Sequence, residues 1–152
     1  MHNITVVAIE KDSKDEFKPI LEGYKKMISR YAKFKSVELF NKKILNSQKR
    51  GEREAKKSYS EAFEPHLGRY NVFLHERGEM LDSMEFSKIF QDNGEINFFI
   101  GGAYGFDEEF LKKGDRLVSL SKMTTSHKIA KLMLFEQIYR ALSIVNKHPY
   151  HK

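Results

Sequence analysis

The chain has no cysteine, and this absence excludes disulfide bonds, thiolate metal sites and a catalytic cysteine. Long apolar runs are missing too, since none approaches the roughly 20 residues that a membrane-spanning helix needs. The first residues, Met1–Ile9, have neither the basic start nor the long apolar core of a signal peptide. We therefore expect a soluble cytoplasmic protein.

Several catalytic and nucleotide-binding motifs are absent as well. No G-x-x-x-x-G-K-[ST] occurs, and Gly101, Gly102 and Gly105 do not form a G-x-G-x-x-G before a long helix, so a nucleotide phosphate is not the expected ligand. No nucleophile elbow supports Ser–His–Asp catalysis. The histidines have no carboxylates at metal-ligand spacing, and we expect no metal site.

Length and charge narrow the class of protein. A chain of 152 residues suits one domain, which we expect to span 1–152. The 27 lysines and arginines against 21 acidic residues give a net charge of +6. A positive balance favours polyanionic partners such as nucleic acid.

Hydrophobic patterning predicts alternating strands and helices. Strand-like runs rich in β-branched and aromatic residues occur at 4–9, 35–40, 69–74, 96–100 and 116–120. Helical spacing occurs at 14–31, after Arg50 as far as Pro65, at 84–90, in a short acidic stretch near 107–111, and at 127–146. This alternation predicts an α/β fold with a mostly parallel sheet and helices on both faces.

Three local details complete this assignment. Ser13 is a candidate N-cap for the first helix, with Glu16 three residues later, although Pro19 favours a later start. Ser83 is a candidate cap for the helix at 84–90. The polar segment 41–50 is expected to be a mobile loop.

The stretch from Ile96 to Thr125 organises the chain. A strand opens into a glycine loop, Gly101–Phe106, and a second strand ends at the polar segment 121–125. Glycine lets backbone approach a ligand and adopt positive φ. A third loop, at 75–79, follows another strand, and loops at the carboxyl ends of parallel strands bind ligands. Their backbone groups suit an adenine and an amino-acid moiety.

Two further features concern partners. The segment 41–57 is strongly basic, and it is either a phosphate-contacting patch or a solvated helix face beside a lysine-rich loop. The helix at 127–146 is apolar over more than one face, which predicts burial on two sides. We expect one of those sides, including Leu134 and Leu142, to face a partner subunit.

Four blocks in order carry a family resemblance: FFIGGAYG at 98–105, LSKMT at 120–124, FEQIYRA at 135–141 and HPYHK at 148–152. The chain resembles, over its whole length, the small ribosomal RNA methyltransferases that modify pseudouridine at N3 in the large subunit, of the α/β-knot or SPOUT class. The resemblance implies a C-terminal trefoil knot, one of the rare exceptions to unknotted topology. It also implies a homodimer that uses S-adenosylmethionine.

The resemblance carries over to individual residues. It implies cofactor binding by Leu74, Gly101, Leu120, Ser121, Lys122, Met123, Thr124 and Thr125. It places Arg140, His148, Tyr150 and His151 near the substrate, with Arg140 as electrostatic stabiliser and Tyr150 and His151 positioning the base or taking its proton.

Departures and alternatives accompany the resemblance. His75 stands where the family usually has aspartate, and Ser126 stands where proline is frequent. We expect Lys49, Arg50, Arg53 and Lys152 to grip ribosomal RNA phosphates. The alternatives are a knotted methyltransferase that acts on tRNA and a non-catalytic RNA-binding module without a cofactor.

Overall fold

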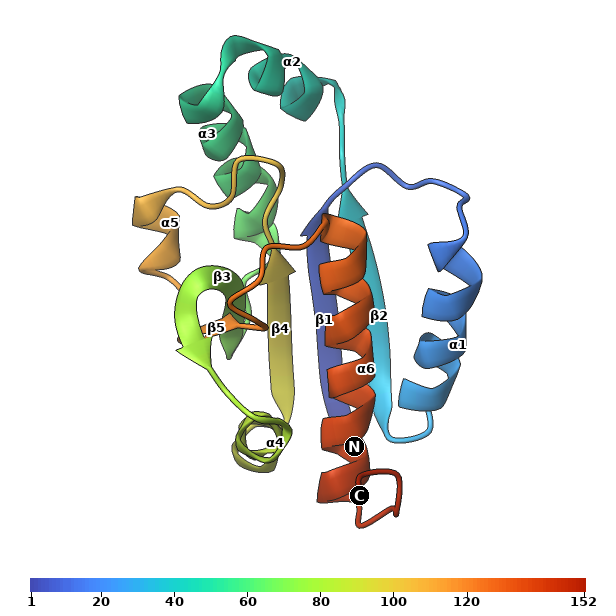
Figure 1. Ribbon diagram of the computed structural model, residues 1–152. Coiled ribbons are helices and arrows are strands. Elements are labelled where there is room, and N and C mark those ends of the chain that lie inside the picture. The colour runs from blue at the N-terminus through green and yellow to red at the C-terminus, as the bar shows by residue number, and fades with distance from the viewer.

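The computed structural model describes residues 1–152 and contains five strands interleaved with helices (Figure 1). The elements, in chain order, are β1 (His2–Ile9), α1 (Phe17–Ile28), β2 (Ala32–Leu39), α2 (Lys42–Arg50), α3 (Glu52–Phe63), the 3-10 turn η1 (Glu64–His66), β3 (Asn71–Met80), α4 (Ser83–Asp92), β4 (Glu95–Ile100), α5 (Glu108–Leu111), β5 (Arg116–Ser119) and α6 (His127–Val145). The predicted alternation of strands and helices is confirmed.

The strands form one sheet in the order β2-β1-β4-β3-β5, and every pair is parallel. Parallel neighbours need crossover connections, which the helices supply. The central strands are apolar along nearly their whole length, as expected for a sheet covered on both faces. The carboxyl ends of β1, β2 and β4 therefore lie at one edge, toward the top of Figure 1, whereas the last part of β3 curves back downward.

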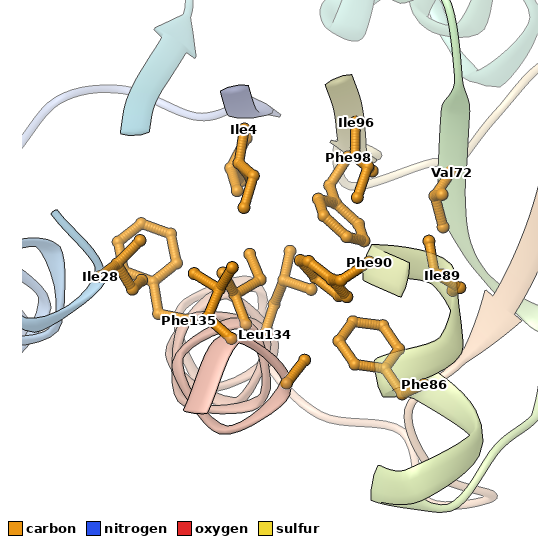
Figure 2. Close-up of a cluster of buried hydrophobic side chains, with 14 of the residues drawn as sticks. Ile4, Ile28, Val72, Phe86, Ile89, Phe90, Ile96, Phe98, Leu134 and Phe135 are labelled. Carbon is orange, nitrogen blue, oxygen red and sulfur yellow. The ribbon is translucent and has the colours of Figure 1, made fainter. Parts of the chain in front are cut away.

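Side chains alternate between the two faces of the sheet and build two separate cores. On one face, Ile4, Phe98 and Val72 pack against α1, α4 and α6, including Phe90 and Phe135 (Figure 2). On the other face, strand residues pack against α2, α3 and α5. That second core contains Val7, Phe73 and Phe99 of the strands with Ile44, Tyr59, Phe63, Phe106 and Phe110. The sheet is thus the middle layer of three.

The basic segment 41–50 is helix α2, so the predicted mobile loop is wrong. The Asn41 side chain caps this helix by accepting a hydrogen bond from the Ile44 N–H at 2.8 Å. Ile44 and Ser47 then face inward and are buried. Spacing of three residues between the buried positions puts them on one helical face, which a reading dominated by lysine content overlooks.

Two predicted helix caps are also wrong. Helix α1 starts at Phe17, near Pro19, and Ser13 does not cap it. Helix α4 is capped by Asp82, whose carboxylate accepts from the Glu85 N–H while the Glu85 side chain accepts from the Asp82 N–H. A capping box satisfies two free N–H groups at once, so it outcompetes the serine that follows it.

Helix α6 is buried on two sides, as predicted, but by its own chain. Leu134 and Leu142 are fully buried within the fold, so they are not available to a partner subunit, and that expectation is wrong. The helix packs against α1 on one side and α4 on the other, as well as on the sheet. Its exposed apolar residues are Ile129 and Met133. No helix combines the length and hydropathy needed to cross a membrane.

Candidate functional site

Three loops meet at the carboxyl edge of β4, β3 and β5, which are consecutive strands in the sheet. They follow Ile100, Leu74 and Ser119, and the loop after β5 leads directly into α6 (Figure 1). Although β4 and β5 are close in sequence, β3 lies between them. The structure therefore gathers the candidate cofactor residues Leu74, Gly101 and 120–125 at one place.

The glycine loop folds back on itself as a tight turn. The N–H of Gly105 donates to the carbonyl of Gly102 at 3.0 Å, and Gly105 has φ of 79°. The positive φ expected of this loop belongs to Gly105. At Gly101 the constraint is space, because the backbone of Gly105 and the ring of Phe106 lie close to it. A Cβ on Gly101 would lie 3.2 Å from the Gly105 backbone, so a valine there would distort the loop itself.

Tyr59 of α3 supports the glycine loop from the second core. A Cβ on Gly102 would lie 2.5 Å from the Tyr59 ring, so only glycine fits. The Tyr59 hydroxyl donates to Gln48 Oε1 and interacts with the backbone at Ala103 and Tyr104. Burial raises the pKa of Tyr59, and the hydrogen bonds to the backbone lower it by less, so the phenol keeps its proton. Nothing in the local sequence around Tyr59 indicated this contact, since it joins segments far apart.

The loop predicted after the third strand is a bulge within β3. Val118 pairs with both Leu74 and Glu79, so the intervening residues protrude. Gly78 is required there because a Cβ would lie 2.6 Å from the Val118 backbone nitrogen. Arg77 at the tip pairs with Glu108 of α5 at 2.5 Å. His75, at the start of the bulge, is half-buried, and burial, followed by the nearby Arg77 charge, lowers its pKa.

The segment after β5 presents mainly backbone and small polar groups. The residues from Ser121 to Thr125 are exposed, while Leu120 packs against the first core. The Ser121 hydroxyl accepts from the Met123 N–H at 3.0 Å and so shapes a local turn. Ser126, at the position where proline is frequent in the resembled family, is the N-cap of α6 and accepts from the Ile129 N–H. The departure thus has a structural use.

The last residues of the chain are docked on α6. Tyr150 donates to Glu136 Oε1 at 3.2 Å, and its ring packs edge-on against Tyr139. Arg140 binds Glu136 through two nitrogens, at 2.7 and 3.0 Å, and contacts His151 Nδ1 at 3.1 Å. The Arg140 guanidinium also lies over the Tyr150 ring. Three of the four candidate catalytic residues therefore form one cluster, which we call the tail cluster.

The tail cluster contains one residue that the sequence analysis missed. Glu136 holds both Arg140 and Tyr150, and its spacing of four residues from Arg140 was an available signal. Its hydrogen bond raises the pKa of Arg140, which stays cationic, whereas burial first and then Glu136 raise the pKa of Tyr150. His148 does not join the cluster, because its ring lies against Tyr31.

The tail cluster and the three loops lie at opposite ends of α6. At 1.5 Å per residue, Arg140 is about 20 Å along the helix from His127. Figure 1 shows α6 running from the loop edge to the end where the chain terminates. Within one chain, the tail cluster is therefore remote from the candidate cofactor loops.

The basic residues predicted to contact RNA lie mostly on α2 and α3, which extend beyond the loop edge of the sheet (Figure 1). Lys49, Arg50 and Arg53 are exposed and take part in no ion pair. Their neighbours Lys43 and Lys56 are paired with Glu61 and Glu52. Lys152 is at the other end of the molecule, beside the tail cluster.

No group of three or more His, Asp or Glu side chains is arranged to hold a metal ion.

Comparison with known proteins gives full-length matches. The family model described as "Predicted SPOUT methyltransferase" matches residues 2–151. A protein of Campylobacter concisus named "Ribosomal RNA large subunit methyltransferase H" is 48% identical over 98% of this chain and 99% of its own length. A protein of the same name from Campylobacter jejuni serotype O:23/36 is 50% identical over the same shares.

Solved structures match in fold. A "probable methylase family protein" from Haemophilus influenzae Rd KW20 superposes with a TM-score of 0.58 at 13% identity, covering 99% of this chain and 71% of that one. At this identity the match concerns the arrangement of strands and helices alone.

Proposed function

Because the chain belongs to the SPOUT methyltransferase family, we propose that it methylates N3 of a pseudouridine in large-subunit ribosomal RNA, as a cytoplasmic enzyme. The relatives that it matches along 98% of its length carry the name of a ribosomal RNA large subunit methyltransferase. Family membership implies the C-terminal knot, within a single domain spanning 1–152. The observation that carries the proposal is the meeting of three loops at one edge of the parallel sheet.

SPOUT methyltransferases use S-adenosylmethionine, and the residues at the loop edge suit it. Leu74 and Leu120 offer half-buried apolar surface, while Gly101 and the segment 121–125 offer backbone groups that a ligand can approach. The cofactor supplies an electrophilic methyl group when it is bound. The task left to the protein is to place the RNA nitrogen in line with that methyl group.

The tail cluster is suited to the proton chemistry. The N3–H of pseudouridine is an imide, and its proton must leave for the nitrogen to attack. Arg140, held cationic by Glu136, stabilises the resulting anion. Tyr150 and His151 lie beside Arg140 and position the base or take its proton. For His151 to take the proton, its Nδ1 must first release the Arg140 N–H that it accepts. His148 is on the same tail but outside the tail cluster, and in this proposal it contacts the RNA next to the target base.

We propose that a homodimer completes the active site. The tail cluster of one chain lies about 20 Å along α6 from that chain's loop edge, so a second copy must bring its tail to the loops. The exposed apolar side chains available for such a contact surface include Met80, Met84, Met123, Ile129 and Met133. A symmetric dimer would cover this surface twice and build two composite sites.

The substrate RNA lies, in this proposal, on the basic surface of α2 and α3. The unpaired cations Lys49, Arg50 and Arg53 are free to bind phosphates, which releases counterions. Lys152 binds phosphate from the tail side. Replacing the three α2 and α3 cations by alanine should weaken RNA binding and reduce the slope of log K against log[salt] by about one per lost contact.

The decisive experiment offers ribosomal particles from a strain lacking the enzyme, with the modified base mapped by mass spectrometry. Methylation at N3 of a large-subunit pseudouridine supports the proposal. Methylation of tRNA only would assign a different substrate, and failure to bind S-adenosylmethionine in calorimetry, even with RNA present, would assign a non-catalytic RNA-binding module.

A mixing experiment tests the composite site. Gly102→Ala damages the loop edge and Arg140→Ala damages the tail cluster, so each variant alone should be inactive. Mixed dimers combine an intact loop edge with an intact tail, and activity should return. Absence of recovery, with mixed dimers demonstrated by mass spectrometry, would show that each chain uses its own tail.

A further inference from the structure

A cleft beside the loop edge is not accounted for by the site described above. It has a volume of about 520 Å³, within the roughly 300–1,000 Å³ typical of small-molecule sites. Its lining includes Ile9, Phe17, Phe40, Gln48, Ala103 and His127. We call it the phenylalanine cleft after its two phenylalanines, Phe17 and Phe40.

Packing in the two cores explains the position of Phe40 but not that of Phe17. Phe40 is half-buried and packs against the second core, whereas Phe17 is half-buried and belongs to neither core. Phe17 is the first residue of α1 and lies at the border of the cleft. The Phe17 ring therefore borders the cleft instead of packing in a core. Leaving apolar surface in contact with water is unfavourable, and folding alone gives no reason for a phenylalanine at this position.

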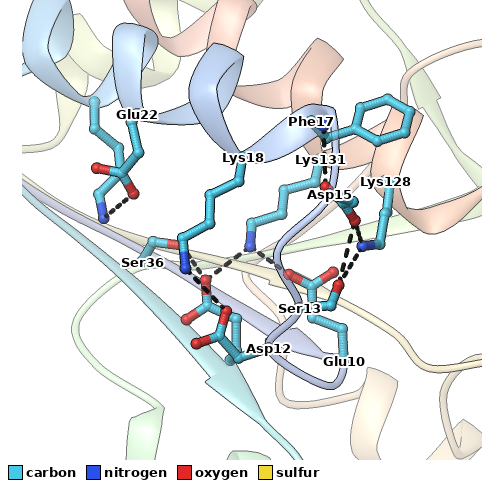
Figure 3. Close-up of polar contacts among 12 residues, drawn as sticks. Glu10, Asp12, Ser13, Asp15, Phe17, Lys18, Glu22, Ser36, Lys128 and Lys131 are labelled. Atoms are coloured by element: carbon cyan, nitrogen blue, oxygen red, sulfur yellow. Dashed lines mark hydrogen bonds and ion pairs between the residues drawn. The ribbon is translucent and has the colours of Figure 1, made fainter.

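A network of ion pairs holds the rim of the cleft in place (Figure 3). Lys131 of α6 is buried and pairs with Glu10, just after β1, and with Glu38 of β2 at 3.0 Å. Lys128 pairs with Asp15 and donates to the Ser13 hydroxyl at 2.7 Å. These bonds fasten residues 10–16 to the start of α6.

Asp15 connects the network to the ring. Its carboxylate accepts from the Phe17 N–H at 3.0 Å, and Figure 3 shows the Phe17 ring beyond Asp15 and beside Lys128. The backbone of Phe17 is thus fixed to a segment that is itself tied to α6, and the rim is formed before any ligand arrives. Preorganisation of this kind lowers the ordering cost of binding.

The surroundings of the cleft indicate which ligand fits. Ala103 of the glycine loop and His127 at the start of α6 line it, so it opens next to the candidate cofactor loops. Gln48 of α2 lines another wall, and the next residues on that helix are the unpaired cations Lys49 and Arg50. A strand of RNA whose phosphates lie on α2 would present a base at this opening.

We propose that the phenylalanine cleft takes one unpaired base of the substrate RNA, stacked on Phe17, with Phe40 as a further apolar contact and the Gln48 amide at its polar edge. Aromatic rings beside a positively charged track are the usual arrangement for holding single-stranded nucleic acid, because every base has a face that stacks. This inference rests on the proposed function only in taking RNA as the ligand. The base is either the methylated one or its neighbour.

The test uses the complete dimer and a hairpin RNA that contains the target nucleotide, with photoreactive iodouridine at the target or at the adjacent position. Irradiation should attach the RNA to the peptide containing Phe17 or Phe40, as identified by mass spectrometry. Attachment from the target position identifies the methylated base as the occupant, and attachment from the adjacent position identifies its neighbour. Attachment only to the peptides of α2 and α3 would overturn the proposal.

Substitutions give an independent measurement. Phe17→Leu keeps apolar volume and removes the ring, and it should weaken RNA binding about 5- to 100-fold, whereas Phe17→Tyr should leave it unchanged. Ile20→Leu is the matched control, since Ile20 is exposed on the same helix and does not line the cleft. Thermal unfolding and S-adenosylmethionine binding should match the wild type in all three variants. Equal RNA binding by Phe17→Leu and wild type would also overturn the proposal.

The two conclusions fail separately. Attachment of RNA in the cleft without methylation of any particle would retain the cleft and refute the proposed activity. Methylation that is insensitive to Phe17→Leu, with no attachment in the cleft, would retain the activity and refute the cleft.

Discussion

Replacing Lys131 by methionine should unfold the protein at a markedly lower temperature. The lysine side chain is only 4% exposed and stands between Glu10, 15% exposed, and Glu38, 31% exposed. Methionine keeps the apolar stem and leaves two carboxylates facing each other without a cation. Removing one member of a buried ion pair costs about 3–5 kcal/mol, and the partial exposure of Glu38 reduces our estimate to about 3 kcal/mol.

This loss can be measured by calorimetry. For a chain of this size, about 3 kcal/mol corresponds to a decrease in Tm of roughly 6–12 °C. Lys113→Met is the matched control, because Lys113 pairs with Glu64 at 2.7 Å while both side chains are about half exposed. An exposed pair contributes about 0–1 kcal/mol, so the control should change Tm little.

A triple variant separates charge from packing. Adding Glu10→Gln and Glu38→Gln to Lys131→Met removes the unpaired carboxylates and should recover most of the lost stability. A Lys131→Met variant within about 1 kcal/mol of wild type would refute the reasoning. So would a triple variant as unstable as the single one.

Three further predictions follow from the loops and the tail. Gly102→Ala should reduce S-adenosylmethionine affinity at least about tenfold, because its Cβ would lie 2.5 Å from the Tyr59 ring, whereas Gly94→Ala meets open space and should bind normally in calorimetry. The lowered pKa of His75 means that the folded state favours the neutral ring, so this stabilisation is complete above about pH 6.5 and is lost as pH falls through the lower folded pKa. Melting curves at pH 7 and pH 5 should therefore show a smaller acid destabilisation for His75→Gln than for wild type. Arg140→Lys should lower kcat more than tenfold in a methylation assay while leaving KM for the cofactor unchanged, because lysine cannot bind Glu136 through two nitrogens.

The sequence by itself determined the strands and the longest helix. Runs such as Val6–Ile9 and Phe98–Ile100 are apolar and rich in β-branched or aromatic residues, so local preference and burial agree, and β1 and β4 form where expected. The same holds for α6, whose apolar positions continue over five turns. The ordered blocks at 98–105, 120–124, 135–141 and 148–152 identified the family, since short motifs can be recognised in a sequence without knowing which residues they contact.

Only the tertiary structure decided how these pieces meet. The order of strands places β3 between β4 and β5, and this brings the three loops together. Contacts between residues distant in sequence also decided that the tail docks on Glu136, that Tyr59 supports Gly102, and that Lys131 lies between two carboxylates. Periodicity reports which side of an element is buried and not which element buries it. The sequence pattern therefore identified Leu134 and Leu142 as buried. It could not tell that α1 and α4 of the same chain pack against α6, because that depends on the packing of the whole fold.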